Sequence, residues 1–197
     1  RLPHHGTRAS RLSPFCGLGF FSGGTAHISE SFAPAVHDFR IFLDWLEAEG
    51  VSQVGGTGIS LGGYTSALLA SGEDRLEFAI PNVPVVSLAD LVLEWFPLNL
   101  SIKAMLKATG TSIRDIRHEM AVHSALTYQP RLPKERLMVI AGAGDRLAPP
   151  KHARLLWDHW DRPRIHWFPG NHLVHLDKGK YLKEMAAFMR EIEFDRM

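Results

Sequence analysis

The pattern G-x-S-x-G at residues 58–62 limits what this 197-residue chain can fold into more than any other stretch. In this pattern a serine occupies a sharp turn between a strand and a helix, where its backbone is strained. The flanking positions approach each other closely, so we expect both to require glycine. An apolar run starting at residues 51–54 precedes the turn, and small apolar residues follow over 64–71. This context predicts a nucleophile elbow with Ser60 at the start of a helix, the alternative being an ordinary glycine-rich turn.

The spacing of the same glycines argues against a dinucleotide-binding loop. Three residues separate Gly58 from Gly62, whereas the pattern G-x-G-x-x-G needs two at that place. A short-chain dehydrogenase would have a further glycine where Tyr64 stands. Its Tyr-x-x-x-Lys pair is also missing after each of the 3 tyrosines. We therefore set the dehydrogenase interpretation aside.

Composition bounds the class of protein. With 45% hydrophobic residues, the chain can bury one sizeable core, and a single domain over 1–197 is expected. A net charge of +1 and 11 scattered histidines give no basic stripe, so nucleic acid is not an expected partner. Cys16 is the single cysteine, which excludes an internal disulfide and favours a reducing, cytoplasmic location. No apolar run reaches the length of about 18 residues that spans a bilayer.

Apolar periodicity predicts strands alternating with helices. Residues 2–5 are expected to end a strand, and residues 8–30 to form a surface excursion. A helix should begin after a capping Ser31 and end at Gly50, and a strand over 76–80 should be closed by Pro81. Further strands are expected at 137–141 and 164–168, and further helices at 150–160 and 181–192. The segment 85–132 is rich in apolar residues and has helix signals, so it is expected to be a helical insert. This order predicts an α/β fold whose mostly parallel sheet has helices on both faces.

Two of these strand ends carry residue types that activate a serine. Asp145 follows the strand at 137–141, and His172 follows the strand at 164–168 in Pro-Gly-Asn-His. A serine hydroxyl needs a base, and the base needs an orienting carboxylate. The chain order Ser60, Asp145, His172 is the one expected of an α/β-hydrolase triad.

Each member of this set has an alternative. Asp145 could instead cap the helix beginning near residue 149, in which case Asp90 and Glu94 are reserve acids. His172 competes with His175 and with His166, which alternates within a strand. Two histidines three residues apart could also suggest a metal site, but without a third ligand motif they are weak evidence, and no metal is expected.

The elbow, the Gly-Ala-Gly-Asp segment ending at Asp145 and the Pro-Gly-Asn-His segment together resemble the α/β-hydrolase superfamily over essentially the whole chain. The opening Leu-Pro-His-His-Gly-Thr and the stretch Gly-Ile-Ser-Leu-Gly-Gly-Tyr are similar to hydrolases related to α/β-hydrolase domain-containing protein 18. The resemblance implies that the backbone N–H groups of Thr7 and Leu61 form an oxyanion hole, with His5 beside the substrate. It also implies that the first strands of the fold precede this sequence.

The sequence thus predicts a serine hydrolase without a cofactor that cleaves a carboxylic ester or related acyl bond of a small molecule. The insert at 85–132, with Trp95 and Phe96, is expected either to cap an acyl-binding site or merely to pack on the core. Two alternatives remain: a peptidase of the prolyl-oligopeptidase type, and a catalytically silent binding module. The oligomeric state is not predicted.

Overall fold

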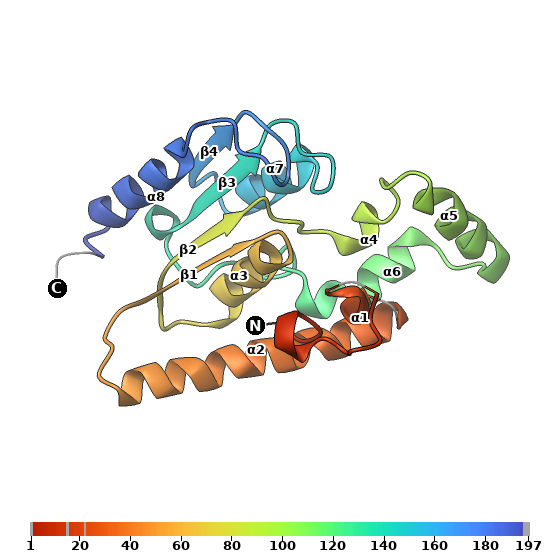
Figure 1. Ribbon diagram of the computed structural model, residues 1–197, viewed down its shortest axis with the longest axis horizontal. Helices are drawn as coiled ribbons and strands as arrows, with labels where there is room; N and C mark the ends of the chain where they lie inside the picture. Colours follow the sequence, from red (N-terminus) through yellow and green to blue (C-terminus); the bar gives the residue numbers. More distant parts are fainter. Residues whose placement is uncertain (1, 15, 22, 195–197) are drawn as a thin grey trace.

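A sheet of four parallel strands forms the centre of the computed structural model, which describes residues 2–14, 16–21 and 23–194 (Figure 1). Neighbouring strands follow one another in chain order: β1 (Val54–Ile59), β2 (Leu76–Asn82), β3 (Met138–Gly142) and β4 (Arg164–Phe168). All four arrows in Figure 1 point towards the side from which the helices between β2 and β3 extend.

Helices fill the connections between the strands. They are α1 (Leu18–Phe21) and α2 (Gly24–Ala48) before β1, α3 (Leu61–Gly72) after it, α4 (Leu88–Leu91), α5 (Leu98–Thr109) and α6 (Ile113–Glu119) between β2 and β3, α7 (Pro150–His159) after β3, and α8 (Lys180–Glu191) after β4. Short 3-10 helices lie at η1 (Gly6–Arg8), η2 (Ala121–His123) and η3 (Lys134–Arg136). Within the residues that the structure describes, no helix has the length and hydropathy needed to cross a membrane.

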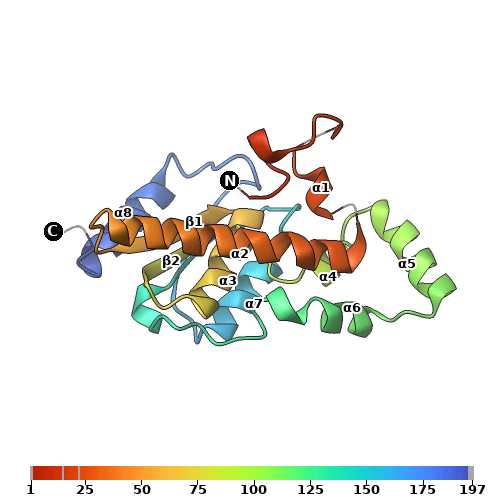
Figure 2. The same ribbon diagram turned by 90° about the horizontal axis from the view of Figure 1, so that it is seen from below.

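Side-chain alternation along β3 shows how the layers form. Val139 and Ala141 belong to a core under α2, α3 and α7, whereas Met138 and Ile140 face Phe188 of α8. Successive side chains of a strand point to opposite faces, so a strand that is buried throughout reads as a continuous apolar run. The sheet is therefore covered on both faces, as Figures 1 and 2 also show. This arrangement confirms the predicted fold class.

A third apolar cluster joins the N-terminal segment to the helices that follow β2. Phe20 and Phe32 pack beside Tyr64 of α3, and Leu88 and Met120 complete the cluster from the other side. Helix α5 differs from this, because none of its residues is buried. Figure 2 shows α5 and α6 extending beyond the sheet, away from α8.

Several boundaries differ from the sequence prediction. Residues 2–5 do not form a strand. Helix α2 begins at Gly24, and Ser31 lies buried inside it rather than capping it. Its buried residues already start at Ile28, before the predicted beginning after Ser31, so the helix is longer at this end than predicted.

Strands β1 and β2 also extend further towards their carboxyl ends than predicted. Strand β1 begins only at Val54 and consists half of glycine, and Val51 lies outside it, exposed. Strand β2 continues through Pro81, because Asn82 still pairs with Ile59 and Ile140. A proline removes one backbone donor from the ladder but leaves its acceptor, so it does not end the strand here.

Candidate active site

Ser60 occupies a strained turn between β1 and α3. Its φ of 57° and ψ of −113° lie in a region that residues with a Cβ rarely adopt. The backbone N–H of Ser60 donates to the carbonyl of Asn82 at 3.0 Å, and its own carbonyl accepts from Tyr64 N–H at 2.9 Å. The surrounding ladder and the first helical turn therefore hold the strain in place.

The glycines around the turn are not equally constrained. A Cβ on Gly58 would lie 2.3 Å from the carbonyl oxygen of Gly62. A Cβ on Gly62 itself would meet no atom within 4 Å, but one on Gly63 would lie 2.7 Å from the carbonyl oxygen of Asn82. The expectation that both flanking positions of the motif need glycine for space is thus wrong at Gly62. The crowded positions are Gly58 and Gly63.

Asp145 and His172 meet at the carboxyl ends of β3 and β4. The imidazole Nδ1 lies 2.7 Å from Asp145 Oδ2, and both side chains are nearly buried, with exposed fractions of 10% for His172 and 0% for Asp145. Asp145 Oδ1 accepts from the N–H groups of Leu147 and Ala148 at 2.8 Å each. The carboxylate thus has one oxygen fixed by the following turn and the other turned to the imidazole. It does not cap α7, whose N-cap is Pro149.

A tight loop after β4 presents His172. Asn171 Oδ1 accepts from the N–H groups of Leu173 and Val174 at 3.0 and 2.9 Å, which folds the chain around the histidine. A backbone bond from Leu176 N–H to the Pro169 carbonyl closes this loop, and one from Gly144 N–H to the Gly170 carbonyl joins it to the Asp145 loop. Sequence reasoning missed the role of Asn171, although an asparagine directly before the histidine is a recognisable turn signal.

The competing residues have other partners. His175 stacks on Phe168 with ring centroids 3.8 Å apart, and its burial lowers the pKa of its imidazole. His166 Nε2 lies 3.2 Å from Asp177 Oδ2, at the far end of the same loop. Among the described residues, no three His, Cys, Asp or Glu side chains gather in a way that could hold a metal ion.

The two reserve acids are likewise engaged elsewhere. Asp90 accepts from Ser87 Oγ at 2.5 Å and pairs with Arg117. Although burial opposes ionisation, these hydrogen bonds leave the pKa of Asp90 lowered. Glu94 pairs with Lys151 at 2.5 Å. Glu94 Oε1 also lies 3.4 Å from His152 Nε2, but among the described residues no hydrogen bond or ion pair joins either acid to His172.

The chain resembles known proteins both in sequence and in fold. No protein-family model matches the chain. Over 173 residues the chain is 35% identical to two uncharacterised Mycobacterium tuberculosis proteins, MT2702 and Rv2627c; the match takes in 87% of this chain and spans 40% of each relative. Among solved structures, the Pyrococcus furiosus esterase Pf2001 matches with a TM-score of 0.56 and 14% identity, over 79% of this chain and 61% of the esterase. A puromycin hydrolase matches with a TM-score of 0.58 and 14% identity, over 84% of this chain and 25% of the hydrolase.

The chain has an α/β-hydrolase fold. In open α/β sheets, ligands bind at the carboxyl ends of the strands. Ser60, Asp145 and His172 follow β1, β3 and β4 at that edge of the sheet. Among the described residues, no hydrogen bond joins the Ser60 hydroxyl to His172; such bonds are often long without substrate and tighten in the complex.

The remaining predicted site residues lie in α3, in the N-terminal segment and in the insert between β2 and β3. Leu61 is the first residue of α3, where backbone N–H groups have no acceptor within the helix, and Thr7 lies in η1. His5 contacts its own segment: its Nδ1 is 2.7 Å from the Pro3 carbonyl, and its ring packs edge-on against Phe20. The roles in the oxyanion hole and in substrate binding stay predictions.

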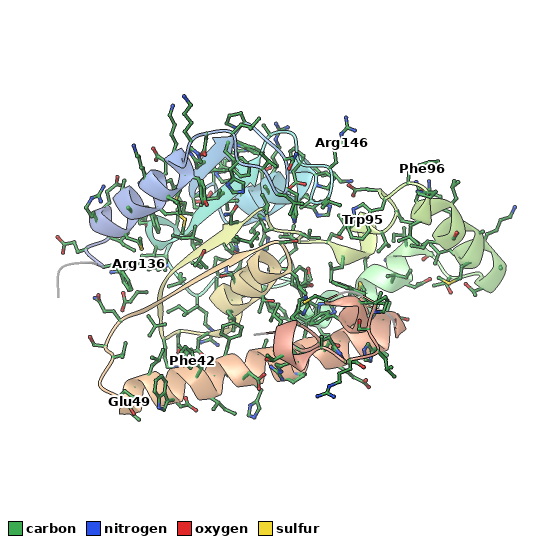
Figure 3. The ribbon with its side chains drawn as sticks, in the orientation of Figure 1. Phe42, Glu49, Trp95, Phe96, Arg136 and Arg146 are labelled. Carbon is green, nitrogen blue, oxygen red and sulfur yellow. The ribbon has the colours of Figure 1, made fainter. Side chains whose placement is uncertain are left out.

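Trp95 lies close to the loop that follows Asp145, and Phe96 is the next residue in the chain (Figure 3). Trp95 Nε1–H donates to the Leu147 carbonyl at 3.1 Å. The Phe96 side chain is 78% exposed. Trp95 is therefore hydrogen-bonded to the loop after Asp145, whereas the Phe96 side chain faces solvent.

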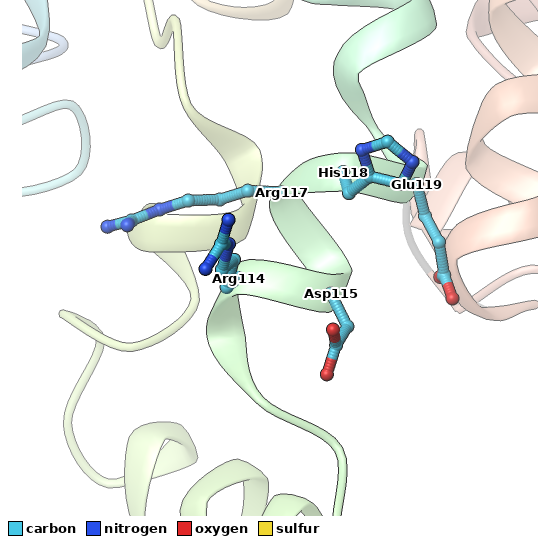
Figure 4. Close-up of a pocket in the computed structure, with 5 residues that line it drawn as sticks. All are labelled: Arg114, Asp115, Arg117, His118 and Glu119. Atoms are coloured by element: carbon cyan, nitrogen blue, oxygen red, sulfur yellow. The ribbon is translucent and has the colours of Figure 1, made fainter.

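Two hollows lie away from this edge. A cavity of about 390 Å³ is lined by Tyr64, residues after β2, and residues near η2, without Ser60, Asp145 or His172. A shallow hollow of about 490 Å³ follows the charged side chains of α6, which Figure 4 shows spreading from one short helix. Arg117 there pairs with Asp90, and Glu119 accepts from Thr25 Oγ1 at 2.6 Å. These charges hold α6 to α4 and α2.

Proposed function

We propose that this chain is a serine hydrolase that cleaves a carboxylic ester or related acyl bond through Ser60, His172 and Asp145. The observation that carries the proposal is the 2.7 Å contact between His172 Nδ1 and Asp145 Oδ2 at the sheet edge where the strained Ser60 turn lies. An esterase and a puromycin hydrolase share the fold, which supports hydrolysis as the reaction class. The relation to the group around α/β-hydrolase domain-containing protein 18 stays a prediction.

Asp145 gives His172 the tautomer that a base needs. An ionised carboxylate only accepts hydrogen bonds, so Nδ1 carries the proton that is shared with Asp145 Oδ2. The other nitrogen, Nε2, then has a free lone pair for the serine proton. Because two backbone N–H groups hold Asp145 Oδ1, the carboxylate keeps its orientation while the imidazole gains and loses charge.

In the reaction, Ser60 Oγ attacks the carbonyl carbon of the ester and His172 Nε2 takes the hydroxyl proton. The N–H groups of Leu61 and Thr7, with the positive end of α3, stabilise the charge on the carbonyl oxygen. His172 returns the proton to the leaving alcohol as the carbon–oxygen bond breaks. Water then repeats the sequence in place of the alcohol, which releases the acid and restores Ser60.

Labelling with a fluorophosphonate probe and hydrolysis of p-nitrophenyl acetate test this proposal together. Ser60→Ala should abolish labelling and lower kcat/KM at least about a thousandfold, and His172→Ala should lose comparable activity. The matched controls are Ser71→Ala, whose hydroxyl only bonds to the Ala67 carbonyl within α3, and His175→Ala. Both controls should keep most of the activity.

Other outcomes would redirect the assignment. Wild-type hydrolysis by a folded Ser60→Ala variant would overturn the nucleophile, and a greater loss in His175→Ala than in His172→Ala would transfer the base. Preferential cleavage of aminoacyl arylamides over aryl esters would favour a peptidase. A folded chain that neither reacts with the probe nor hydrolyses any ester would be a binding module.

A further inference from the structure

The turn that holds Asp145 is itself held by the segment after α4. Leu147 has two roles in this contact: its N–H donates to Asp145 Oδ1 at 2.8 Å, and its carbonyl accepts from Trp95 Nε1–H at 3.1 Å. Trp95 comes from the insert between β2 and β3, far along the chain from Leu147. The two hydrogen bonds therefore form a chain from the insert through one residue to the Asp145 carboxylate.

A second contact fastens the same two segments. Glu94, the residue before Trp95, pairs with Lys151 at 2.5 Å, and His152 Nε2 lies 3.4 Å from the same carboxylate oxygen. His152 is fully buried, and its Nδ1 accepts from the backbone N–H of Ser87 just before α4. Contacts from both ends of α4 thus reach the first turn of α7, which directly follows the Asp145 turn.

We propose that Trp95 is a positioning residue for Asp145: its indole N–H fixes the Leu147 peptide, and this peptide orients the carboxylate towards His172. The inference rests on the proposed function for its kinetic consequence. The backbone N–H groups of Leu147 and Ala148 both donate to Asp145 Oδ1, and the Leu147 carbonyl is the group of this turn that Trp95 contacts. The ion pair between Glu94 and Lys151 keeps the neighbouring Trp95 indole within hydrogen-bond distance of the Leu147 carbonyl.

This role differs from the substrate contact that the sequence suggested for Trp95. A side chain that only touches substrate changes KM, whereas one that orients the acid changes kcat. When the carboxylate becomes less well oriented, kcat should therefore fall and the hydrogen bond at His172 Nδ1 should weaken.

The decisive variant is Trp95→Phe, which removes the N–H and keeps most of the apolar ring. We expect kcat for p-nitrophenyl acetate to fall about three- to tenfold, the rate equivalent of one hydrogen bond, with KM nearly unchanged. Glu94→Gln should change kcat in the same direction by a smaller factor. The matched control is Trp45→Phe on α2, the same chemical change at a side chain that is 53% exposed and stacks on Phe42.

A proton NMR readout keeps this test independent of catalysis. The low-field resonance of His172 Nδ1–H, assigned by its loss in His172→Ala, should broaden or shift in Trp95→Phe and stay in Trp45→Phe. A raised KM with unchanged kcat, or an unchanged resonance, would overturn the positioning role while leaving the proposed function in place. A wild-type chain without labelling or ester hydrolysis would overturn the function, and the resonance would still decide whether Trp95 orients Asp145.

Discussion

The glycines around the Ser60 turn differ in how closely other atoms surround them. Gly58 is fixed because any Cβ would lie 2.3 Å from the Gly62 carbonyl oxygen, a backbone atom that moves only if the turn opens. At Gly63 a Cβ would lie 2.7 Å from the carbonyl oxygen of Asn82, which also accepts the Ser60 N–H. A Cβ on Gly62 would meet no atom within 4 Å, so packing does not require glycine at this position of the motif.

These differences predict an unequal alanine series. Gly58→Ala and Gly63→Ala should each lower the free energy of unfolding by about 2 kcal/mol or more, because backbone must shift to accept the methyl group. Gly62→Ala should be neutral or stabilising by up to about 1 kcal/mol, because alanine is the better helix former. Urea unfolding of the three variants measures this order. An equal loss in all three would show that the motif is constrained by something other than these contacts.

The sequence contained enough to bring Asp145 and His172 together, because each follows a buried strand and parallel strands end at one edge. It did not contain the details that hold them. The two N–H donors to Asp145 come from Leu147 and Ala148, whose side chains carry no signal for this role. The sequence also does not show why Gly55 stands in β1, where a Cβ would lie 2.1 Å from the ring of Phe78 on the neighbouring strand.

An ion-pair network joins three elements at the opposite end of the sheet. Glu73, directly after α3, accepts from Arg75 Nε and Nη2 at 2.8 and 3.0 Å. Arg75 also reaches Asp44 of α2 at 2.6 Å, and Arg40 of α2 lies 3.4 Å from Glu73. Glu73 is 4% exposed, so its charge depends on these partners. The network fastens α2 to the turn between α3 and β2.

This network predicts a specific pH dependence of stability. The hydrogen bonds from Arg75 lower the pKa of Glu73 from 4.5 to about 2. A carboxylate whose pKa is lower in the folded state stabilises the fold above its unfolded pKa, and the contribution is lost as pH falls through 4.5 towards 2. Glu73→Gln should therefore cost about 1–2 kcal/mol at pH 7 and progressively less below pH 4.5.

Urea unfolding at pH 7 and at pH 3 measures the difference. The control is Asp74→Asn, which removes the same charge from the next residue, where the side chain is 74% exposed and 3.6 Å from Arg131. That variant should change the free energy of unfolding little at either pH. A Glu73→Gln penalty that stays constant down to pH 3, or that equals the Asp74→Asn effect, would remove the network from the account of stability.

At the level of elements, periodicity predicted the interior best. Strand β4 matches its predicted range 164–168, and β3, α7 and α8 differ from theirs by about one residue at each end. These elements pack against one or other of the two covered faces of the sheet, so their apolar residues recur at regular spacing in the sequence. Apolar character indicates burial less well in α2, where Phe39, Phe42 and Trp45 are 40%, 51% and 53% exposed. A periodic pattern does not say how far the covering surface extends.

The whole molecule shows an uneven distribution of exposed apolar side chains. Leu147 and Leu173, close in sequence to Asp145 and His172, are 48% and 81% exposed. On the insert between β2 and β3, Phe96 is 78% exposed, and Leu100 and Met105 of α5 are 57% and 54% exposed. Other residues of the insert, such as Leu88 and Leu91, are buried and hold it to the core. The insert therefore has a part around α4 that packs on the core and an unpacked part, with Phe96 and α5, whose apolar side chains are exposed. The chain spans 40% of the length of the curated relatives it matches.

If the unpacked part receives the acyl group of the substrate, longer acyl chains should be preferred. In a series of p-nitrophenyl esters from acetyl to octanoyl, kcat/KM should rise by at most about fourfold per methylene, the value of burying a CH₂ group. Phe96→Ala should flatten this rise, because its ring is among the most exposed of these apolar groups. Leu12→Ala is the matched control, since Leu12 is 94% exposed in the N-terminal segment, and it should leave the slope unchanged. A flat or falling profile in the wild-type chain would mean that these side chains do not bind the acyl group, and that their exposure serves packing against other protein surface.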